Sequence, residues 1–201
     1  MAKKLVITGG PCAGKTSSME ILRAALANID SCVLFVPEAA TDLILSGISP
    51  RTCPSVLDFQ TQVIALQIER EIAADAAAGE ALLSDGKNAV VICDRGICDS
   101  RAYLSAGDYA RALAANGLDA QTALERYDAV FYLDSIASTN PEAYTCSNNS
   151  ARFSDAQEAA LADARTFEAW SAHPHVIRIG NESDFEQKTS KLVSAIMRHA
   201  S

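Results

Sequence analysis

Short apolar segments recur along the chain, each bounded by polar or turn-forming residues. Within each segment the apolar residues run continuously instead of alternating with polar ones, which is typical of strands buried on both faces of a sheet. Longer segments with helical spacing lie between them. The expected strands are Leu5–Thr8, Cys32–Val36, Ala89–Cys93, Ala129–Leu133 and Val176–Ile179, and the expected helices are Lys15–Ile29, Val56–Ala78, Leu161–Ser171 and Phe185–His199.

The alternation of these elements predicts an α/β fold, in which a five-stranded parallel sheet is flanked by helices on both sides. Right-handed crossovers between parallel strands bring the carboxyl ends of all the strands to one edge of the sheet. The loops that follow the strands are therefore expected to carry the chemistry. With 201 residues the chain has the size of one such unit, and we expect a single domain over residues 1–201.

The loop after the first expected strand is rich in glycine. Its sequence GGPCAGKT fits the pattern G-x-x-x-x-G-K-[ST] and lies between a strand and the start of a helix. In this pattern the backbone N–H groups and the helix N-terminus surround a phosphate, Lys15 adds a full positive charge, and Thr16 offers its hydroxyl to magnesium. The alternative, a glycine turn with an exposed lysine, leaves the flanking strand and helix unexplained. The expected triphosphate-binding residues are Gly9, Gly10, Pro11, Cys12, Ala13, Gly14, Lys15, Thr16 and Ser17.

Charged residues follow the second and third expected strands. Glu38 comes at the end of the second strand, and Asp94 and Arg95 come at the end of the third, so all three should lie beside the phosphate loop. Asp94 is suited to hold magnesium, and Arg95 to contact a phosphate or Glu38 itself. Glu38 would accept the proton of an attacking hydroxyl within hydrogen-bond reach. Either carboxylate alone is equally well explained as a helix N-cap, but two of them beside a phosphate loop favour catalysis.

The motifs GGPCAGKTS, VPEAATDLI and DRGICDSRAYL occur in this order in the first half of the chain. Together they resemble the P-loop domain of the NadR-like family of small AAA-type ATPases, which includes ribosylnicotinamide kinases, and they are also similar to the deoxynucleoside and thymidylate kinases. The resemblance implies a P-loop NTPase with strand order 2-3-1-4-5, ATP and magnesium as cofactors, and transfer of a phosphoryl group to a small hydroxyl compound. The segment DFQTQVIALQIER is similar to the helix in which a glutamine of those kinases contacts the acceptor base, which points to Gln60.

Two functions remain open on the sequence. A kinase for a nucleoside-like metabolite needs a pocket for the acceptor between Glu38, Arg51, Gln60 and Tyr103, with Arg95 beside it. A nucleotide-dependent switch or ATPase that acts on a partner protein would instead have a flat apolar surface there, and Glu38 would orient a water molecule. No N-K-x-D element follows the fourth expected strand, which favours ATP over GTP.

The segment from about residue 138 to residue 171 lies where such kinases carry a lid. Arg152 or Arg165 within it would move toward the transferred phosphoryl group and stabilise its charge. Alternatively, both arginines pair with acidic neighbours on a helix surface. Nucleotide kinases usually have an arginine-rich lid, so this arginine-poor segment favours an uncharged acceptor. The segment VIRIGNESDF resembles the last strand and the loop that packs the adenine, where Asn181 either contacts the adenine or caps the next helix.

Composition narrows the remaining classes of function. The 17 Lys and Arg residues against 25 Asp and Glu residues give a net charge of −8, which disfavours binding to nucleic acid or to anionic membranes. No apolar run approaches the ~20 residues of a membrane span, and the six cysteines stand singly, as in a reducing compartment. His173 and His175 flank a proline, and we expect a turn there because no third metal ligand is evident. These features predict a cytoplasmic protein. Its expected partners are a nucleotide triphosphate, which the phosphate loop predicts, and a small-molecule acceptor, which the resemblance to kinases implies.

Overall fold

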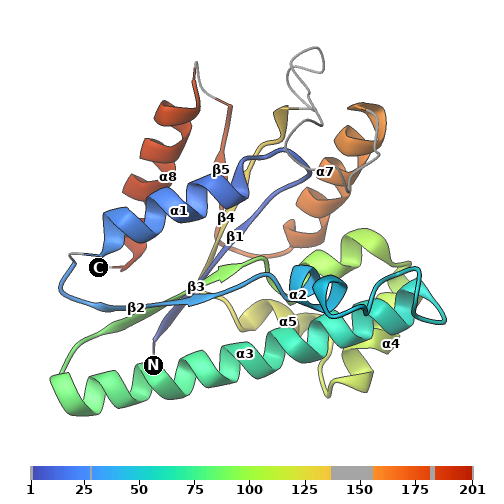
Figure 1. Cartoon of the computed structure of the whole chain (residues 1–201), viewed down its shortest axis with the longest axis horizontal. Helices are drawn as coiled ribbons and strands as arrows, with labels where there is room; N and C mark the ends of the chain where they lie inside the picture. The colour runs from blue at the N-terminus through green and yellow to red at the C-terminus, as the bar shows by residue number, and fades with distance from the viewer. Residues whose placement is uncertain (1, 28, 137–155, 182–183, 201) are drawn as a thin grey trace.

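The structure is a computed structural model that describes residues 2–27, 29–136, 156–181 and 184–200 (Figure 1). Five parallel strands form one sheet in the order β2-β3-β1-β4-β5. This arrangement confirms both the α/β fold and the strand order of a P-loop NTPase. The strands are β1 (Lys3–Thr8), β2 (Cys32–Val36), β3 (Ala89–Asp94), β4 (Ala129–Leu133) and β5 (Val176–Ile179).

The register of the strands aligns the residues that precede the loops of interest. Ile7 of β1 lies opposite Asp94 of β3, and Val36, the last residue of β2, lies opposite Cys93. Because all the strand pairs are parallel, the loops after β1, β2 and β3 leave the sheet at the same edge.

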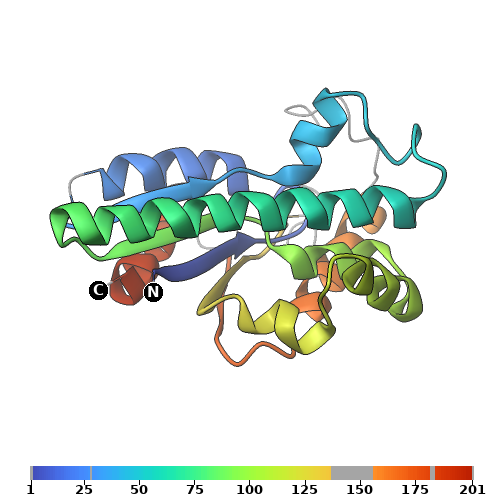
Figure 2. The same cartoon turned by 90° about the horizontal axis from the view of Figure 1, so that it is seen from below.

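Helices cover both faces of the sheet, as the two views in Figures 1 and 2 show. Leu5 and Ile7 of β1 point into a core beneath α1 (Lys15–Leu26) and α8 (Phe185–Ala200), whereas Val6 points into a core on the opposite face. The buried strands therefore read as continuous apolar runs because both of their faces are covered. The second core lies under α3 (Val56–Asp85), the 3-10 helix η1 (Ile97–Tyr103), α4 (Ala106–Ala115), α5 (Ala120–Glu125) and α7 (Ala156–Trp170).

Helix α3 is longer than the sequence pattern predicted. It continues past Ala78 to Asp85, because the segment EALL after Gly79 consists of strong helix formers and the helix tolerates this one interior glycine. The helix ends where Gly86 adopts a φ of +65° and donates its N–H to the Leu82 carbonyl, a common C-terminal cap. Among the described ranges, no helix combines the length and the apolar character that crossing a bilayer requires.

Several short elements were not expected from the sequence. Helix α2 (Ala39–Leu45), η1 and α5 are too short to give a clear periodic signal. The ends of the longer helices also shift, with α1 ending at Leu26, α7 beginning at Ala156 and α8 ending at Ala200. The strands match their expected positions more closely, because each is bounded by polar residues.

Candidate functional site

Lys15 stabilises the loop between β1 and α1 by hydrogen bonds to the loop's own backbone. The Lys15 side chain is buried, and its Nζ donates to the backbone oxygens of Gly9 at 3.1 Å and Gly10 at 3.5 Å. Cys12 and Gly14 have φ angles of +55° and +82°, so the chain curls just before α1. A loop of this shape at a helix N-terminus presents N–H groups and partial positive charge to a phosphate. This is the geometry that the glycine-rich motif predicts.

Asp163 of α7 holds the same loop from outside. Its buried carboxylate accepts the Gly10 N–H at 3.0 Å and the Tyr132 hydroxyl at 2.6 Å. A Cβ atom on Gly10 would lie 2.5 Å from Asp163 Oδ1, so the close approach requires glycine. Sequence reasoning missed this role of Asp163, because the contact joins residues far apart in the chain and no local pattern marks it.

Lys188 of α8 connects the phosphate loop with the loop after β5. Its buried Nζ donates to the Ala13 carbonyl at 3.0 Å, the Asp134 carbonyl at 2.5 Å and Asn181 Oδ1 at 2.7 Å. Burial lowers the pKa of Lys188 to about 8, against the opposing effect of Asp134 and of a second carboxylate. Asn181 is thus part of this network, and Asp184 caps α8 instead, accepting the Gln187 N–H at 2.8 Å.

Glu38 and Arg95 form an ion pair at the same edge of the sheet. Arg95 Nε donates to Glu38 Oε1 at 2.6 Å, and the Thr41 hydroxyl donates to Glu38 Oε2 at 2.8 Å. Glu38 precedes α2, yet within the described residues its side chain caps none of the N–H groups of that helix. Burial alone would raise the pKa of Glu38, but the charges of Arg95 and Lys15 and these hydrogen bonds lower it below its ordinary value. Glu38 is therefore ionised at neutral pH.

Asp94 has a buried oxygen, Oδ1, to which no described residue donates a hydrogen bond. Burial and the nearby charge of Glu38 raise the pKa of Asp94, while Lys15 and Arg95 act in the opposite direction. An unpartnered carboxylate oxygen beside a phosphate loop is a suitable ligand for a hard cation. The residues present therefore fit magnesium, with the exposed Thr16 at the start of α1 as a second source of oxygen.

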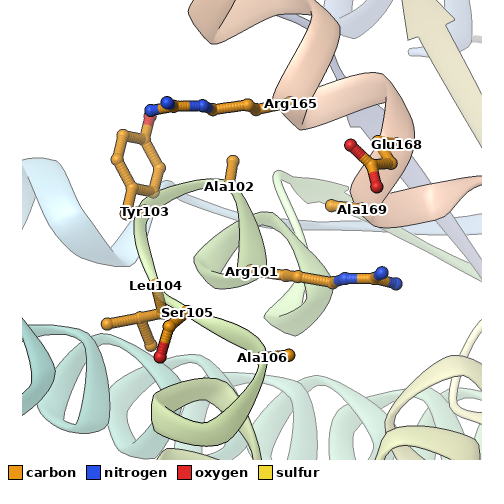
Figure 3. A pocket seen from close by; sticks show the side chains of 9 residues that line it. All are labelled: Arg101, Ala102, Tyr103, Leu104, Ser105, Ala106, Arg165, Glu168 and Ala169. Atoms are coloured by element: carbon orange, nitrogen blue, oxygen red, sulfur yellow. The ribbon is translucent and has the colours of Figure 1, made fainter.

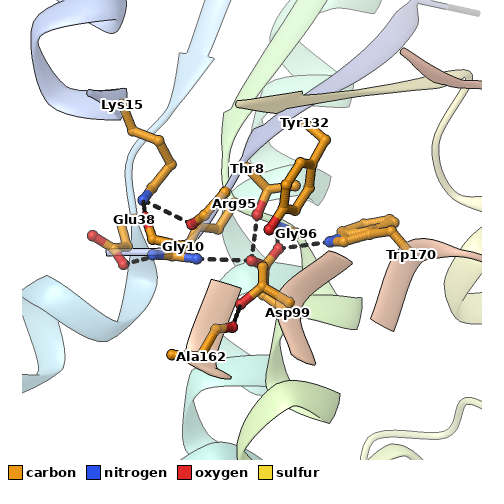
Figure 4. A network of polar contacts seen from close by, with 12 residues as sticks. Thr8, Gly10, Lys15, Glu38, Arg95, Gly96, Asp99, Tyr132, Ala162 and Trp170 are labelled. Atoms are coloured by element: carbon orange, nitrogen blue, oxygen red, sulfur yellow. Dashed lines mark hydrogen bonds and ion pairs between the residues drawn. The ribbon is translucent and has the colours of Figure 1, made fainter. Parts of the chain in front are cut away.

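Asp99 of η1 lies at the centre of a buried polar network (Figure 4). Its Oδ1 accepts from the Thr8 hydroxyl at 2.5 Å and from Arg95 Nη1 at 2.8 Å. Its Oδ2 accepts from the Gly96 N–H and from Trp170 Nε1, both at 3.1 Å. Sequence reasoning did not single out Asp99, although its place four residues after Arg95 in a quoted motif was an available signal.

A cavity of about 470 Å³ opens beside Glu38 and Arg95. Gln60, Tyr103 and Arg165 also line it, and apolar side chains make up much of the remaining wall. Gln60 is buried, and its side chain makes no hydrogen bond within the described part of the chain. A second cavity of about 480 Å³ shares Tyr103 and Arg165 with the first, and Figure 3 shows the Arg165 side chain extending from α7 toward Tyr103.

Other predicted site residues lie elsewhere. Arg51 is exposed in the loop after α2 and does not line the cavity, although its neighbour Pro50 does. Arg152 lies outside the described residues. Arg165 is exposed and forms no ion pair with any described residue. The buried His173 hydrogen-bonds the Tyr127 carbonyl at 2.9 Å, which gives this histidine a structural role in the turn before β5.

The sheet order and the lysine-containing glycine loop before α1 define a P-loop NTPase fold. A family model described as an AAA domain matches residues 4–188. The chain therefore belongs to this AAA domain family, and a nucleotide-binding P-loop is the shared feature of the site. A search of curated proteins finds no match to the sequence.

Proposed function

We propose that the chain is a magnesium-ATP-dependent kinase that phosphorylates a small, hydroxyl-bearing, nucleoside-like metabolite, as the resemblance to NadR-like kinases implies. The observation that carries this proposal is the cavity of about 470 Å³ beside the phosphate loop, with Glu38 and Arg95 in its wall. A switch or ATPase acting on a partner protein needs no enclosed space for a second small molecule at this place. The cavity is within the size range of small-molecule sites.

The nucleotide side of the site is assigned to the loop and its neighbours. In this proposal residues 9–17 and the Lys15 ammonium hold the β- and γ-phosphates through the loop's N–H groups, apart from Pro11, which has none, and Gly10, whose N–H is bonded to Asp163. Asn181 lies near the adenine in this proposal. Asp94 and Thr16 hold magnesium, which neutralises phosphate charge when bound. Transfer of a phosphoryl group depends mainly on positioning and charge neutralisation, and this set of residues supplies both.

The acceptor side is assigned to Glu38 and its ion pair. An ionised Glu38 accepts the proton of the acceptor hydroxyl as that oxygen attacks the γ-phosphorus and the bond to the β-phosphate oxygen breaks. Arg95 orients the carboxylate through the 2.6 Å hydrogen bond and keeps it ionised. In this proposal Arg152 or Arg165 would approach the transferred group from the segment around α7.

The cavity also indicates what kind of acceptor fits. The apolar wall includes Phe59, Val63 and Ile64, which suit a planar ring, and the buried Gln60 amide offers one donor and one acceptor to the edge of a base or carboxamide. The charge of Arg95 is already balanced by two carboxylates. We therefore infer an uncharged acceptor, with Tyr103 closing the far side.

The test is ADP release from magnesium-ATP, measured with the purified protein alone and with a panel of nucleosides, nicotinamide riboside and other small hydroxyl metabolites. We expect one compound to stimulate ADP release and to yield a phosphate ester detectable by mass spectrometry. Slow hydrolysis that no compound alters would contradict the kinase and favour a nucleotide switch with a protein partner.

Glu38→Gln tests the role of the proposed base. Loss of a general base slows turnover by about 10²–10⁴-fold, while ADP affinity should stay within about twofold because the phosphate loop is unchanged. Single-turnover transfer and calorimetric ADP binding would measure the two effects. Glu80→Gln, which changes an exposed glutamate on α3, is the matched control and should leave both unaltered. Normal turnover of the Glu38 variant would remove the base assignment.

A further inference from the structure

We propose that Asp99 is a positioning residue, which fixes the Arg95 guanidinium against Glu38 and so sets the geometry of the base. This inference rests on the proposed kinase function. The contact that carries it is the hydrogen bond from Arg95 Nη1 to Asp99 Oδ1 at 2.8 Å, opposite the bond from Arg95 Nε to Glu38 Oε1 at 2.6 Å. One guanidinium is thus held between two carboxylates.

The backbone at Arg95 explains why such a restraint is needed. Arg95 has a φ of +69°, in the left-handed region that a residue with a side chain adopts only when its surroundings hold it there. Its N–H donates to the Ile7 carbonyl at 3.0 Å, and its own carbonyl accepts from Gln67 Nε2 at 3.3 Å. These bonds fix the main chain, but the long side chain beyond Cβ needs its own anchor.

Asp99 is itself immobilised, so it can serve as that anchor. The Thr8 hydroxyl and Trp170 Nε1 donate to its two oxygens from β1 and α7. Gly96 permits the close approach of Trp170, because a Cβ on Gly96 would lie 2.8 Å from the indole ring. A buried carboxylate with four donors has no freedom to rotate, and it transmits this rigidity to Arg95.

The third guanidinium nitrogen, Arg95 Nη2, makes no hydrogen bond to any described residue. It belongs to a side chain that lines the acceptor cavity. With Nε and one N–H of Nη1 committed to carboxylates, Nη2 has both of its N–H groups left for a ligand in that cavity. Asp99 thereby determines which edge of Arg95 faces the reacting groups.

The alternative is that Asp99 only caps η1, through the bond from the Gly96 N–H. The two roles are separated by nitrogen-15 NMR of the arginine side chains at neutral pH without ligand. A guanidinium that is hydrogen-bonded at Nε and Nη1 rotates slowly about its Cζ–Nε bond, and its two Nη nitrogens then give separate signals. The signals that disappear in Arg95→Lys belong to Arg95. We expect Asp99→Asn to merge these two signals, because the bond from Nε to Glu38 does not block rotation about the Cζ–Nε bond and the bond from Nη1 to Asp99 does. Two signals that stay resolved in Asp99→Asn would show that Asp99 does not restrain the guanidinium and only caps η1.

Kinetics give the second readout. Because misplacing a catalytic group by about 1 Å can cost 10²-fold in rate, Asp99→Asn should lower kcat by about 10²-fold while the KM for ATP stays within about twofold. Asp108→Asn is the matched control, since Asp108 is also an aspartate in the first turn of a helix with its carboxylate bonded to an arginine, but on α4 outside the cavity. It should leave kcat and the Arg95 signals unchanged.

Thr8→Val keeps the test decisive if Asp99→Asn fails to fold. This nearly isosteric change removes one anchor of Asp99 Oδ1, and we expect broadened Arg95 signals with about a threefold to tenfold lower kcat. Resolved Arg95 signals and unchanged kcat in the folded variants would overturn the positioning role. If the wild-type protein phosphorylates no acceptor, the proposed function fails, and the NMR signals, which need no substrate, still decide whether Asp99 holds Arg95.

Discussion

Because Gly10 has no Cβ, helix α7 can pack directly against the phosphate loop. The space that an alanine Cβ would fill is already taken by Asp163, whose Cα would lie 2.7 Å away and whose Oδ1 would lie 2.5 Å away. Backbone atoms cannot give way as a flexible side chain can. Gly10 therefore has a steric reason to be glycine in addition to the flexibility that the motif requires.

Gly10→Ala should therefore destabilise the fold by about 1–3 kcal/mol, the usual range for overpacking a buried site, and weaken ADP binding at least tenfold. Chemical denaturation and calorimetry would measure the two effects. Gly79→Ala is the matched control, because nothing lies within 4 Å of a Cβ at that position on α3. This control should stabilise the helix by about 0.5–1 kcal/mol. ADP binding of wild-type strength in Gly10→Ala would show that α7 does not constrain the loop.

At this scale, sequence reasoning located the residues that follow strand ends. Glu38, Asp94 and Arg95 were found because parallel strands bring their ends to one edge, and the structure does place the Glu38 carboxylate on the Arg95 guanidinium. Asp99 and Asp163 were not singled out. Their partners depend on how η1 and α7 pack, and a pattern along the chain carries no information about such long-range contacts.

At the scale of elements, a buried cation of α8 bonds to the phosphate loop. Lys188 donates to three oxygens from three different segments. Replacing it with methionine keeps the length of the side chain but leaves two backbone carbonyls and one amide oxygen without this donor. Unsatisfied buried acceptors cost about 1–3 kcal/mol each, so we expect Lys188→Met to destabilise the fold.

Lys188→Met should also change how stability depends on pH. The pKa of Lys188 is lowered from 10.5 to about 8 in the folded protein. Between these two values the unfolded chain holds a proton that the folded chain has released, so this group adds to the unfolding free energy as pH rises. We expect the wild-type advantage over the variant to be constant below pH 8 and to grow from about pH 8 to 10.5.

The measurement is urea denaturation of both proteins across this range, taking the difference at each pH. Subtraction cancels the opposite trend from groups such as the buried Cys98 thiol. Burial raises the pKa of Cys98 to about 12, so this group lowers the unfolding free energy as pH rises. A difference that stays flat through pH 10 would show that Lys188 has an ordinary pKa.

The elements themselves were predictable to different degrees. The strands were found almost residue for residue, because continuous apolar runs between polar residues have few other interpretations. Helix ends were less certain, since α3 passes the expected end at Ala78 and stops only at the Gly86 cap. Among the short elements, α2, η1 and α4 pack on α3, and α5 packs on α4 and η1, which is a tertiary cause that local patterns do not contain.

At the scale of the whole molecule, nucleotide binding is expected to stabilise the fold. A ligand at 100 times its Kd adds about 2.7 kcal/mol to the unfolding free energy, which for a chain of this size corresponds to a rise in Tm of about 5–11 °C. Differential scanning fluorimetry with ADP and magnesium would measure it. Lys15→Ala should abolish the shift, because the buried ammonium is the full charge of the loop. An equal shift in that variant would place the nucleotide elsewhere.

The overall architecture was the most predictable level. The alternation of strands and helices requires a parallel sheet with covered faces, and the resemblance supplied the strand order that the structure confirms. What the sequence could not provide is the cavity, because its wall combines residues from α2, α3, η1 and α7. Arg51, expected to reach that wall from a nearby position in the chain, remains in solvent.

Helix α7 contacts three parts of the site, through Asp163 to the phosphate loop, through Arg165 to the cavity and through Trp170 to Asp99. In the proposed kinase, a ligand that shifts this helix at one contact would shift it at the others, so we expect the binding of nucleotide and of acceptor to be thermodynamically linked. Binding free energies around a closed cycle must sum to zero, so each substrate changes the affinity of the other by the same factor. Substitutions along α7 that touch neither substrate would therefore tune the cooperativity between them.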